Sequence, residues 1–142
     1  MASNPVQALR RKLYEVLDAA LDVEVYRDGI PRLGAKIPSV SISHVGGSGE
    51  PLGLGRWITA SAQGEALILR VQLDVFHSSQ ADLDALADQV YNVLFNAYAD
   101  LAAIGVLAYR ITLSADMPAE EQLSRSEYRK VLDYEFLLEY LS

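Results

Sequence analysis

The chain has 142 residues, of which 51% are hydrophobic, carries a net charge of −7 and contains no cysteine. This length predicts one domain over residues 1–142 with a single packed core, and the absence of cysteine excludes disulfides, thiolate metal sites and a cysteine nucleophile. The acidic balance argues against tight general binding of nucleic acid, which needs several cations on one face. We find no apolar run or leading signal that predicts a membrane span or secretion, so we expect synthesis in the cytoplasm.

The first predicted element is an amphipathic helix from Pro5 to about Leu21. Asn4 is placed to cap this helix, and a proline in the first turn favours its start. A short extended piece over residues 23–32 follows, interrupted by the turn signal Asp28-Gly29. In residues 37–45, serines alternate with Val40, Ile42 and His44, which predicts a strand with one buried face.

The segment from Gly46 to Gly55 contains five glycines and a proline and predicts a flexible loop. It lacks the Lys-Ser/Thr pair with which a glycine loop binds phosphate. Residues 56–62 and 65–77 predict two strands joined by a tight turn around Gly64. The second strand has one apolar face, made of Leu67, Leu69, Val71, Leu73 and Val75.

A second helix is predicted from about Gln80 to Ile104, opened by a capping pattern in which Ser79 precedes Asp82 by three residues. Its apolar stripe contains Leu83, Leu86, Ala87, Val90, Leu94, Ala97 and Leu101. Three aromatic residues, Tyr91, Phe95 and Tyr98, widen this stripe to almost half of the circumference. A helix that rests on one sheet needs less, so the pattern predicts apolar surface that is available for another partner.

Gly105 ends this helix, and residues 106–114 predict a strand, followed by a loop over residues 115–124. The last strand begins at Tyr128, and its aromatic face is expected to close the core. Its polar face is a candidate for charged contacts with a neighbouring subunit. The order of elements predicts an α+β fold with a mainly antiparallel sheet and two main helices packed on one face.

The sequence lacks the patterns of a catalytic, cofactor-binding or metal-binding site. His44 and His77 stand at predicted strand ends, far apart in sequence and without a ligand pattern around them. Trp57, the only tryptophan, follows the glycine segment and fits either a core residue or a contact anchor. We therefore expect no enzyme activity, no cofactor and no metal.

Three stretches of the chain share a pattern with a known family. IPSVSISHVGG (37–47) is a short strand that begins with an apolar residue and proline. LRVQLDVFHSSQADLDALADQVYNVL (69–94) is a strand-to-helix unit, and YRKVLDYEFLLEY (128–140) is a closing strand. In this order they resemble the tail terminators, the small tail-completion or head-tail joining proteins of tailed phages. The likeness departs from the family pattern at Asp28-Gly29 and in the Gly46–Gly55 segment.

The resemblance implies a structural virion protein of the tail or neck that assembles with itself as a ring, usually a hexamer. Such a ring caps the tube of the major tail tube protein, ends its polymerisation and binds the head-tail connector protein, while viral DNA passes through the hole. A ring subunit needs extra apolar surface and a long edge strand, and we expect the second helix and the terminal strand to supply these. The candidate interface residues are Arg56, Trp57, Tyr91, Phe95, Tyr98, Arg129, Asp133, Glu135 and Glu139.

Two other functions stay open from the sequence. One is a head-side adaptor or stopper ring of the neck, and the other is a small α+β ligand-binding domain or enzyme with a site around Trp57, His44 and His77. Residues 71–109 contain five aspartates and no lysine or arginine. If a ring forms, we expect part of this acidic surface to line the channel and keep DNA from sticking, rather than arginines such as Arg56 or Arg125.

Overall fold

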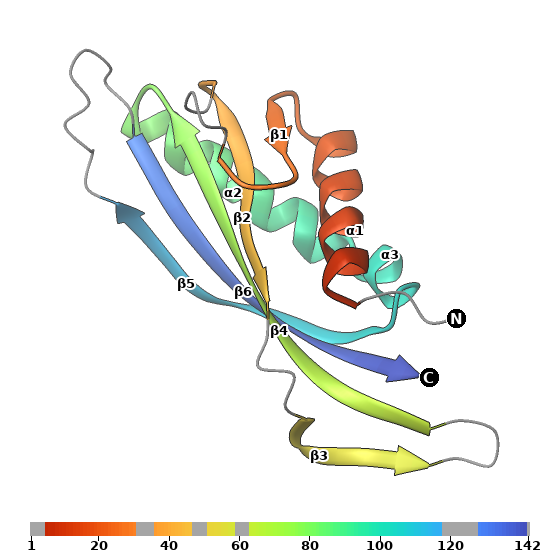
Figure 1. The fold of residues 1–142 in the computed structure, drawn as a ribbon. Coiled ribbons are helices and arrows are strands. Elements are labelled where there is room, and N and C mark those ends of the chain that lie inside the picture. The colour runs from red at the N-terminus through yellow and green to blue at the C-terminus, as the bar shows by residue number, and fades with distance from the viewer. Residues whose placement is uncertain (1–4, 31–35, 47–50, 59–62, 118–127, 142) are drawn as a thin grey trace.

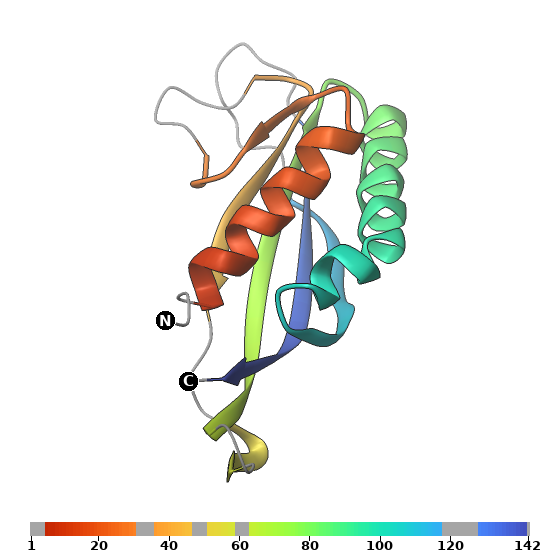
Figure 2. The ribbon, with the colours of Figure 1, turned by 90° about the vertical axis from the view of Figure 1, so that its right-hand side faces the viewer.

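The structure, a computed structural model, describes residues 5–30, 36–46, 51–58, 63–117 and 128–141, with side chains for all of these except 51–58, 63–66, 140 and 141. Six strands form one twisted sheet, and the helices lie together on one of its faces (Figures 1 and 2). All but one of the strand pairings are antiparallel. The predicted α+β class is therefore confirmed.

The helix α1 spans Pro5–Ala20, close to its prediction, and buries Leu9, Leu13 and Leu17 against the sheet and α2. The proposed cap Asn4 lies outside the described residues. The predicted second helix is split into α2, Gln80–Asn96, and α3, Tyr98–Ala102. Ala97 leaves the helical conformation at φ −92° and ψ 13°, yet it remains buried, so the apolar stripe continues across the break.

The ends of α2 and α3 follow the sequence signals. Ser79 caps α2, its side chain accepting a hydrogen bond from the backbone N–H of Asp82 at 3.2 Å. After α3, Gly105 has φ +96°, and a Cβ there would lie 2.7 Å from the carbonyl oxygen of Glu139. Glycine is therefore required where the chain turns from α3 into the next strand.

Five strands follow the order β1-β2-β4-β6-β5 across the sheet, and β3 pairs with β4 off this path. β1 is Glu24–Tyr26, β2 is Ser39–Gly46, β3 is Pro51–Ile58, β4 is Gln63–His77, β5 is Val106–Met117 and β6 is Tyr128–Leu141. β4 and β6 pair along their whole shared length, from Gly64 opposite Leu141 to His77 opposite Tyr128. Beyond the helix layer, β3 and the adjoining ends of β4 and β6 project as an arm (Figures 1 and 2).

The terminal strand is an interior strand, so its expected role as a long edge strand is wrong. β6 lies between β4 and β5, and β5 is the edge. The alternation of apolar and polar residues in β6 shows only that helices cover one of its faces. An interior strand and an edge strand can both have this pattern. The edge surface available to a partner therefore belongs to β5.

Three local predictions also need correction. The register of β2 shifts between Ile42 and His44, so that His44 is exposed and Val45 is buried in the core. Pro51–Ile58, placed largely in the glycine loop, is paired with β4 as β3. Gly64 lies within β4 opposite Trp57 rather than in a turn. The periodicity of the sequence could not predict the bulge in β2 or the pairing of β3 with β4, because neither feature produces a periodic pattern.

The hydrophobic core lies between the helices and the sheet. The predicted apolar faces of β4 and α2 are both buried there. Phe136 on β6 is fully buried and stacks on Tyr109 of β5, with 5.4 Å between ring centroids. This packing fixes α2 alongside β6 and β5, and so determines which flank of α2 faces the sheet edge.

Candidate assembly surface

Three exposed aromatic residues lie together on one flank of α2 and α3. Tyr91, Phe95 and Tyr98 have exposed fractions of 43%, 65% and 68%. Tyr91 and Phe95 stack with 6.3 Å between ring centroids. These three residues form what we call the aromatic ridge. Their exposure agrees with the wide apolar arc predicted from the sequence, which exceeds what the sheet covers.

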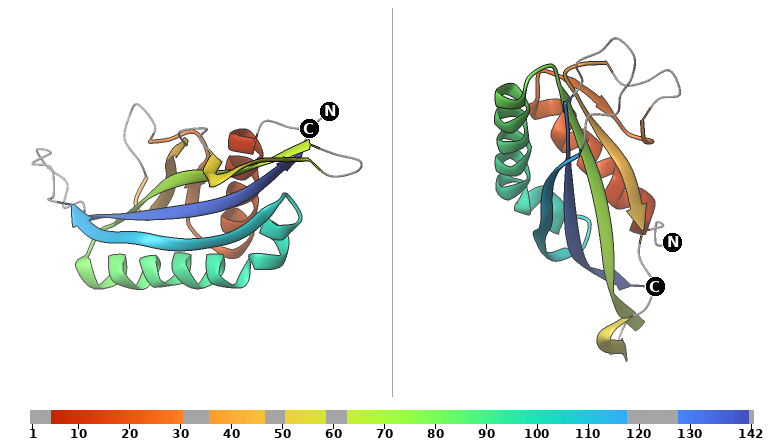
Figure 3. Two further views of the ribbon diagram at one scale, coloured as in Figure 1. Left: turned by 90° about the horizontal axis from the view of Figure 1, so that it is seen from below. Right: turned by 90° about the vertical axis from the view of Figure 1, so that its left-hand side faces the viewer.

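The aromatic ridge lies beside the edge strand β5. The hydroxyl of Tyr109 donates hydrogen bonds to the carbonyl oxygens of Leu94 and Phe95. At the other end of the helix, Gln80 Nε2 donates to Asp116 Oδ1 at 3.1 Å. α2 therefore runs along the length of β5 (Figure 3, left). β5 also has exposed apolar side chains, Leu107, Leu113 and Met117, but Leu113 and Met117 lie opposite Asp133 and Arg129, on the face of the sheet away from the helices.

Acidic groups occupy the first half of the same helix flank. Asp84 accepts hydrogen bonds from Lys130 Nζ at 2.7 Å and from Gln80 Nε2 at 3.0 Å. The hydrogen bond from Lys130 lowers the pKa of Asp84, and the same bond raises the pKa of Lys130. Of the five aspartates between residues 71 and 109, Asp74 is fully buried, so only the other four contribute to the acidic surface.

The polar face of β6, predicted to contact a neighbour, is partly used within the chain. Arg129 Nε and Nη2 both contact Asp74 Oδ1, at 2.8 Å and 2.7 Å. Glu135 lies between Arg70 and Arg110, at 3.9 Å and 3.7 Å. Asp133 and Glu139 are half-buried. Arg70 and Arg110 remain highly exposed on this open face of the sheet, opposite the helices.

The buried polar cluster around Asp74 was not predicted from the sequence. Besides Arg129, the carboxylate accepts hydrogen bonds from the Ser43 hydroxyl and from Gln72 Nε2. The guanidinium of Arg129 also lies 5.7 Å from the ring centroid of Phe76. A signal for this cluster was present, because aspartate is depleted in strands and one within a strand needs a charged partner. That partner, however, lies 55 residues away.

The residues of the predicted ligand or enzyme site do not converge. His44 pairs with Gln72 of β4, whereas Trp57 pairs with Gly64 at the other end of that strand. His77 is 13 residues from Gly64 along β4, which corresponds to roughly 40 Å of strand. No metal-binding group of three or more suitable residues occurs in the described part of the chain. The side chains of Arg56 and Trp57, and the whole of Arg125, lie outside the described residues.

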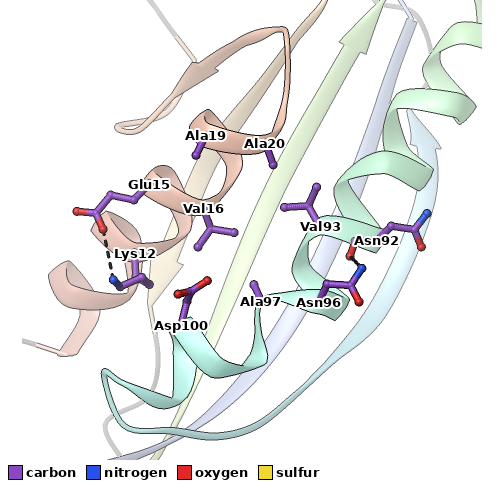
Figure 4. A pocket seen from close by; sticks show the side chains of 10 residues that line it. All are labelled: Lys12, Glu15, Val16, Ala19, Ala20, Asn92, Val93, Asn96, Ala97 and Asp100. Atoms are coloured by element: carbon purple, nitrogen blue, oxygen red, sulfur yellow. Dashed lines mark hydrogen bonds and ion pairs between the residues drawn. The ribbon is translucent and has the colours of Figure 1, made fainter.

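An open groove of about 530 Å³ lies between α1 and the α2–α3 pair (Figure 4). Its floor consists of small and apolar residues such as Val16, Ala20 and Val93, and its rim is polar. Lys12 and Glu15 form an ion pair at 3.4 Å on the α1 side, and Asn96 donates to the carbonyl oxygen of Asn92 at 2.9 Å on the other. Lys12, Glu15 and Asn96 are thus engaged within their own helices, whereas Asp100 on the same rim has no hydrogen bond or ion pair with the described residues.

Among known proteins, the chain has similarity to solved structures alone. No protein-family model matches the chain, and no curated protein matches its sequence. None of the described helices is long and apolar enough to cross a membrane. Among solved structures, a chain from the virion of a native gene transfer agent particle is similar, with a TM-score of 0.51 and 14% identity. The match covers 96% of this chain and 99% of that chain, and at this identity it shows a shared fold.

Proposed function

We propose that this chain is a non-enzymatic structural protein of a phage-like virion, and that it acts at the end of the tail as a terminator. The observation that carries the proposal is the fold shared with a virion chain over nearly the full length of both proteins. The order of the three family-like stretches along the sequence supports the same assignment. A fold alone does not determine function, so the surface must also fit the role.

The surface fits a subunit that meets copies of itself through two different patches. The aromatic ridge and the edge of β5 lie at one side of the sheet, and β3 lies at the other side. Two different patches produce a head-to-tail contact, and such contacts close into a ring when the rotation between copies permits it. A ring of this kind, with six copies in the proposed terminator, would cap the tail tube and receive the connector on its other side.

The acidic residues of α2 and α3 outside the aromatic ridge support a role in which DNA passes without being held. Asp82, Asp88 and Asp100 are exposed, and no lysine or arginine lies between Val71 and Tyr109 in the sequence. If this surface lines the channel, it repels phosphates during passage. A lumen lined mainly by Arg70 and Arg110 would contradict this part of the proposal.

Electron microscopy of tail tubes tests the assignment. Tubes assembled from the tube protein of the same virion, incubated with this chain, should carry a ring at one end and stop growing at that end. Uncapped tubes that continue to grow would overturn the proposal. Binding to the portal complex in place of the tube would instead support the head-side adaptor or stopper.

A further inference from the structure

The edge strand β5 lacks most of the features that protect a sheet edge from pairing. It is 12 residues long and contains neither proline nor lysine, although short length, proline and lysine are the usual protection. No other described strand pairs with its outer side. The register with β6 shifts twice, between Val106 and Ala108 near the start of β5 and between Ile111 and Leu113 in its middle, and such bulges are the one usual protection that β5 has. Between these shifts, Ala108–Ile111 is a regular stretch that an added strand could extend.

The aromatic ridge stands above this same stretch. Tyr109 is hydrogen-bonded to the carbonyl of Phe95 at 3.4 Å, which places the regular part of β5 next to the ridge. A strand added to β5 would project alternate side chains towards the helix layer. Those side chains would cover the parts of Tyr91 and Phe95 that the described chain leaves exposed. The free backbone edge and the exposed rings therefore form one docking site for an extended apolar segment.

The chain contains a segment with matching chemistry in β3. β3 pairs with β4 on one side, and no described strand pairs with its other side. Its sequence, PLGLGRWI, has four large apolar residues, one arginine and no acid. The α2 flank supplies exposed aromatic rings and aspartates, of which Asp84 is already paired with Lys130 and Asp88 is exposed. β3 is also on the arm that projects beyond the helices, where a second molecule can reach it (Figure 1).

We propose that β3 of one copy pairs with the β5 edge of the next copy and covers its aromatic ridge. This inference rests on the proposed ring. Because β3 and β5 lie at opposite edges of the same sheet, each copy would give one strand and accept one. Repetition of this contact joins the sheets around the ring and pairs the free edges of β3 and β5, as closure pairs the edges of a β-barrel.

Engineered cysteines test the pairing directly, since the chain contains no cysteine of its own. We would combine Arg110→Cys on β5 with either Leu54→Cys or Gly55→Cys on β3, which samples both faces of β3. The matched control replaces Gln89 by cysteine, at an exposed position on the opposite flank of α2. On capped tubes under mild oxidation, at least one Arg110 pair should give a ladder of linked subunits, and the Gln89 pairs should give none.

A second experiment tests the ridge without cross-linking. Phe95→Glu places a charge in the centre of the proposed contact and, because Phe95 is 65% exposed, should leave folding intact. Assembly should weaken by at least about tenfold, as expected for a buried aromatic contact. Gln89→Glu adds the same charge outside the contact and should assemble like the wild type. Sedimentation and tube capping measure assembly, and circular dichroism checks the fold of each variant.

The outcomes separate this inference from the proposed function. If the wild type forms rings that cap tubes, two results would overturn the β3–β5 contact: normal assembly of Phe95→Glu, or cross-linking of the Gln89 pairs only. Either result would leave the terminator proposal unaffected. A wild-type protein that neither forms rings nor caps tubes overturns both. Loss of assembly in Phe95→Glu together with the Arg110 ladder supports the contact.

Discussion

The two faces of the sheet bury side chains of opposite character on the same strands. On the face covered by helices, β4 and β6 contribute apolar residues such as Leu73, Phe136 and Leu138, each at most 1% exposed. On the open face, one strand position away, β4 buries the carboxylate of Asp74 beneath the guanidinium of Arg129. One face is stabilised by area removed from water, and the other by a few directional contacts.

This difference has a consequence for how each face tolerates change. Hydrophobic burial is non-directional and scales with area, so a loss on the helix face is shared among many contacts. A buried charge depends on very few partners, and removing one leaves an uncompensated ion. Substitutions of similar size on the two faces should therefore lower stability for different reasons, and different second substitutions should be needed to restore it.

The largest effect is expected on the helix face. Phe136→Ala removes a fully buried ring that contacts both Tyr109 and Tyr134. It should lower the free energy of unfolding by about 3–5 kcal/mol, measured by chemical denaturation. Leu107→Ala, at an exposed position of β5, is the control and should change stability little. A loss below about 1 kcal/mol for Phe136→Ala would show that the core can collapse around the cavity.

Removing Arg129 from the open face should lower the free energy of unfolding by nearly as much. Arg129→Ala leaves Asp74 buried without its ion-pair partner and should cost about 3 kcal/mol, the low end for such pairs because Arg129 is 26% exposed. The double variant Asp74→Asn/Arg129→Ala removes the stranded charge and should be more stable than Arg129→Ala. If the double variant is instead less stable than Arg129→Ala, the unpaired carboxylate of Asp74 is not the cause of the stability loss.

A hydroxyl on the open face gives a smaller effect. Ser43 donates a hydrogen bond to Asp74 Oδ2, which also accepts from Gln72 Nε2 at 3.3 Å. Ser43→Ala should therefore cost about 1.5 kcal/mol, the lower range for a bond to a charged group. Ser39→Ala is the matched control on the same strand, because the buried Ser39 hydroxyl has no partner among the described residues. Equal losses in the two variants would contradict a specific role for Ser43.

The sequence could predict one face of the sheet far better than the other. Apolar spacing identified the buried face of β4, the stripe on α2 and the exposed ridge at Phe95, because burial on one side leaves a period in the chain. The Ser79 cap was predictable because its donor lies only three residues away. Local signals of this kind account for the elements and for the candidate assembly surface on α2.

What could not be predicted depends on pairing between distant segments. The interior position of β6, the bulge after Ile42 and the ion pair between Asp74 and Arg129 each require knowledge of which strands are neighbours. Alternation shows that a strand has two faces and does not show its position in the sheet. The edge position of β5, on which the proposed subunit contact depends, could therefore be identified only from the strand order in the structure.

Acidic pH should weaken one exposed contact at the margin of the helix face. Lys130 lowers the pKa of Asp84 below its ordinary value of 3.8, so the ionised carboxylate favours the folded state. Its contribution is fully present above that ordinary pKa and is lost as the pH falls through the lower folded pKa. The stability gap between wild type and Asp84→Asn should therefore shrink below about pH 4 in a denaturation series. A gap that is constant from pH 2 to pH 7 would contradict this assignment.

The smallest effect should come from a hydroxyl on the helix face, in contrast to Ser43. Burial raises the pKa of Tyr134 above its ordinary value, and its hydroxyl has no hydrogen-bond partner among the described residues. Tyr134→Phe removes this unpaired group and keeps the ring against Phe136. Since an unpaired buried hydroxyl costs free energy, stability should stay the same or rise slightly, measured by thermal and chemical denaturation. A loss above about 1 kcal/mol would mean that the hydroxyl is satisfied in solution, by water or by another segment, and that the helix face also depends on directional contacts.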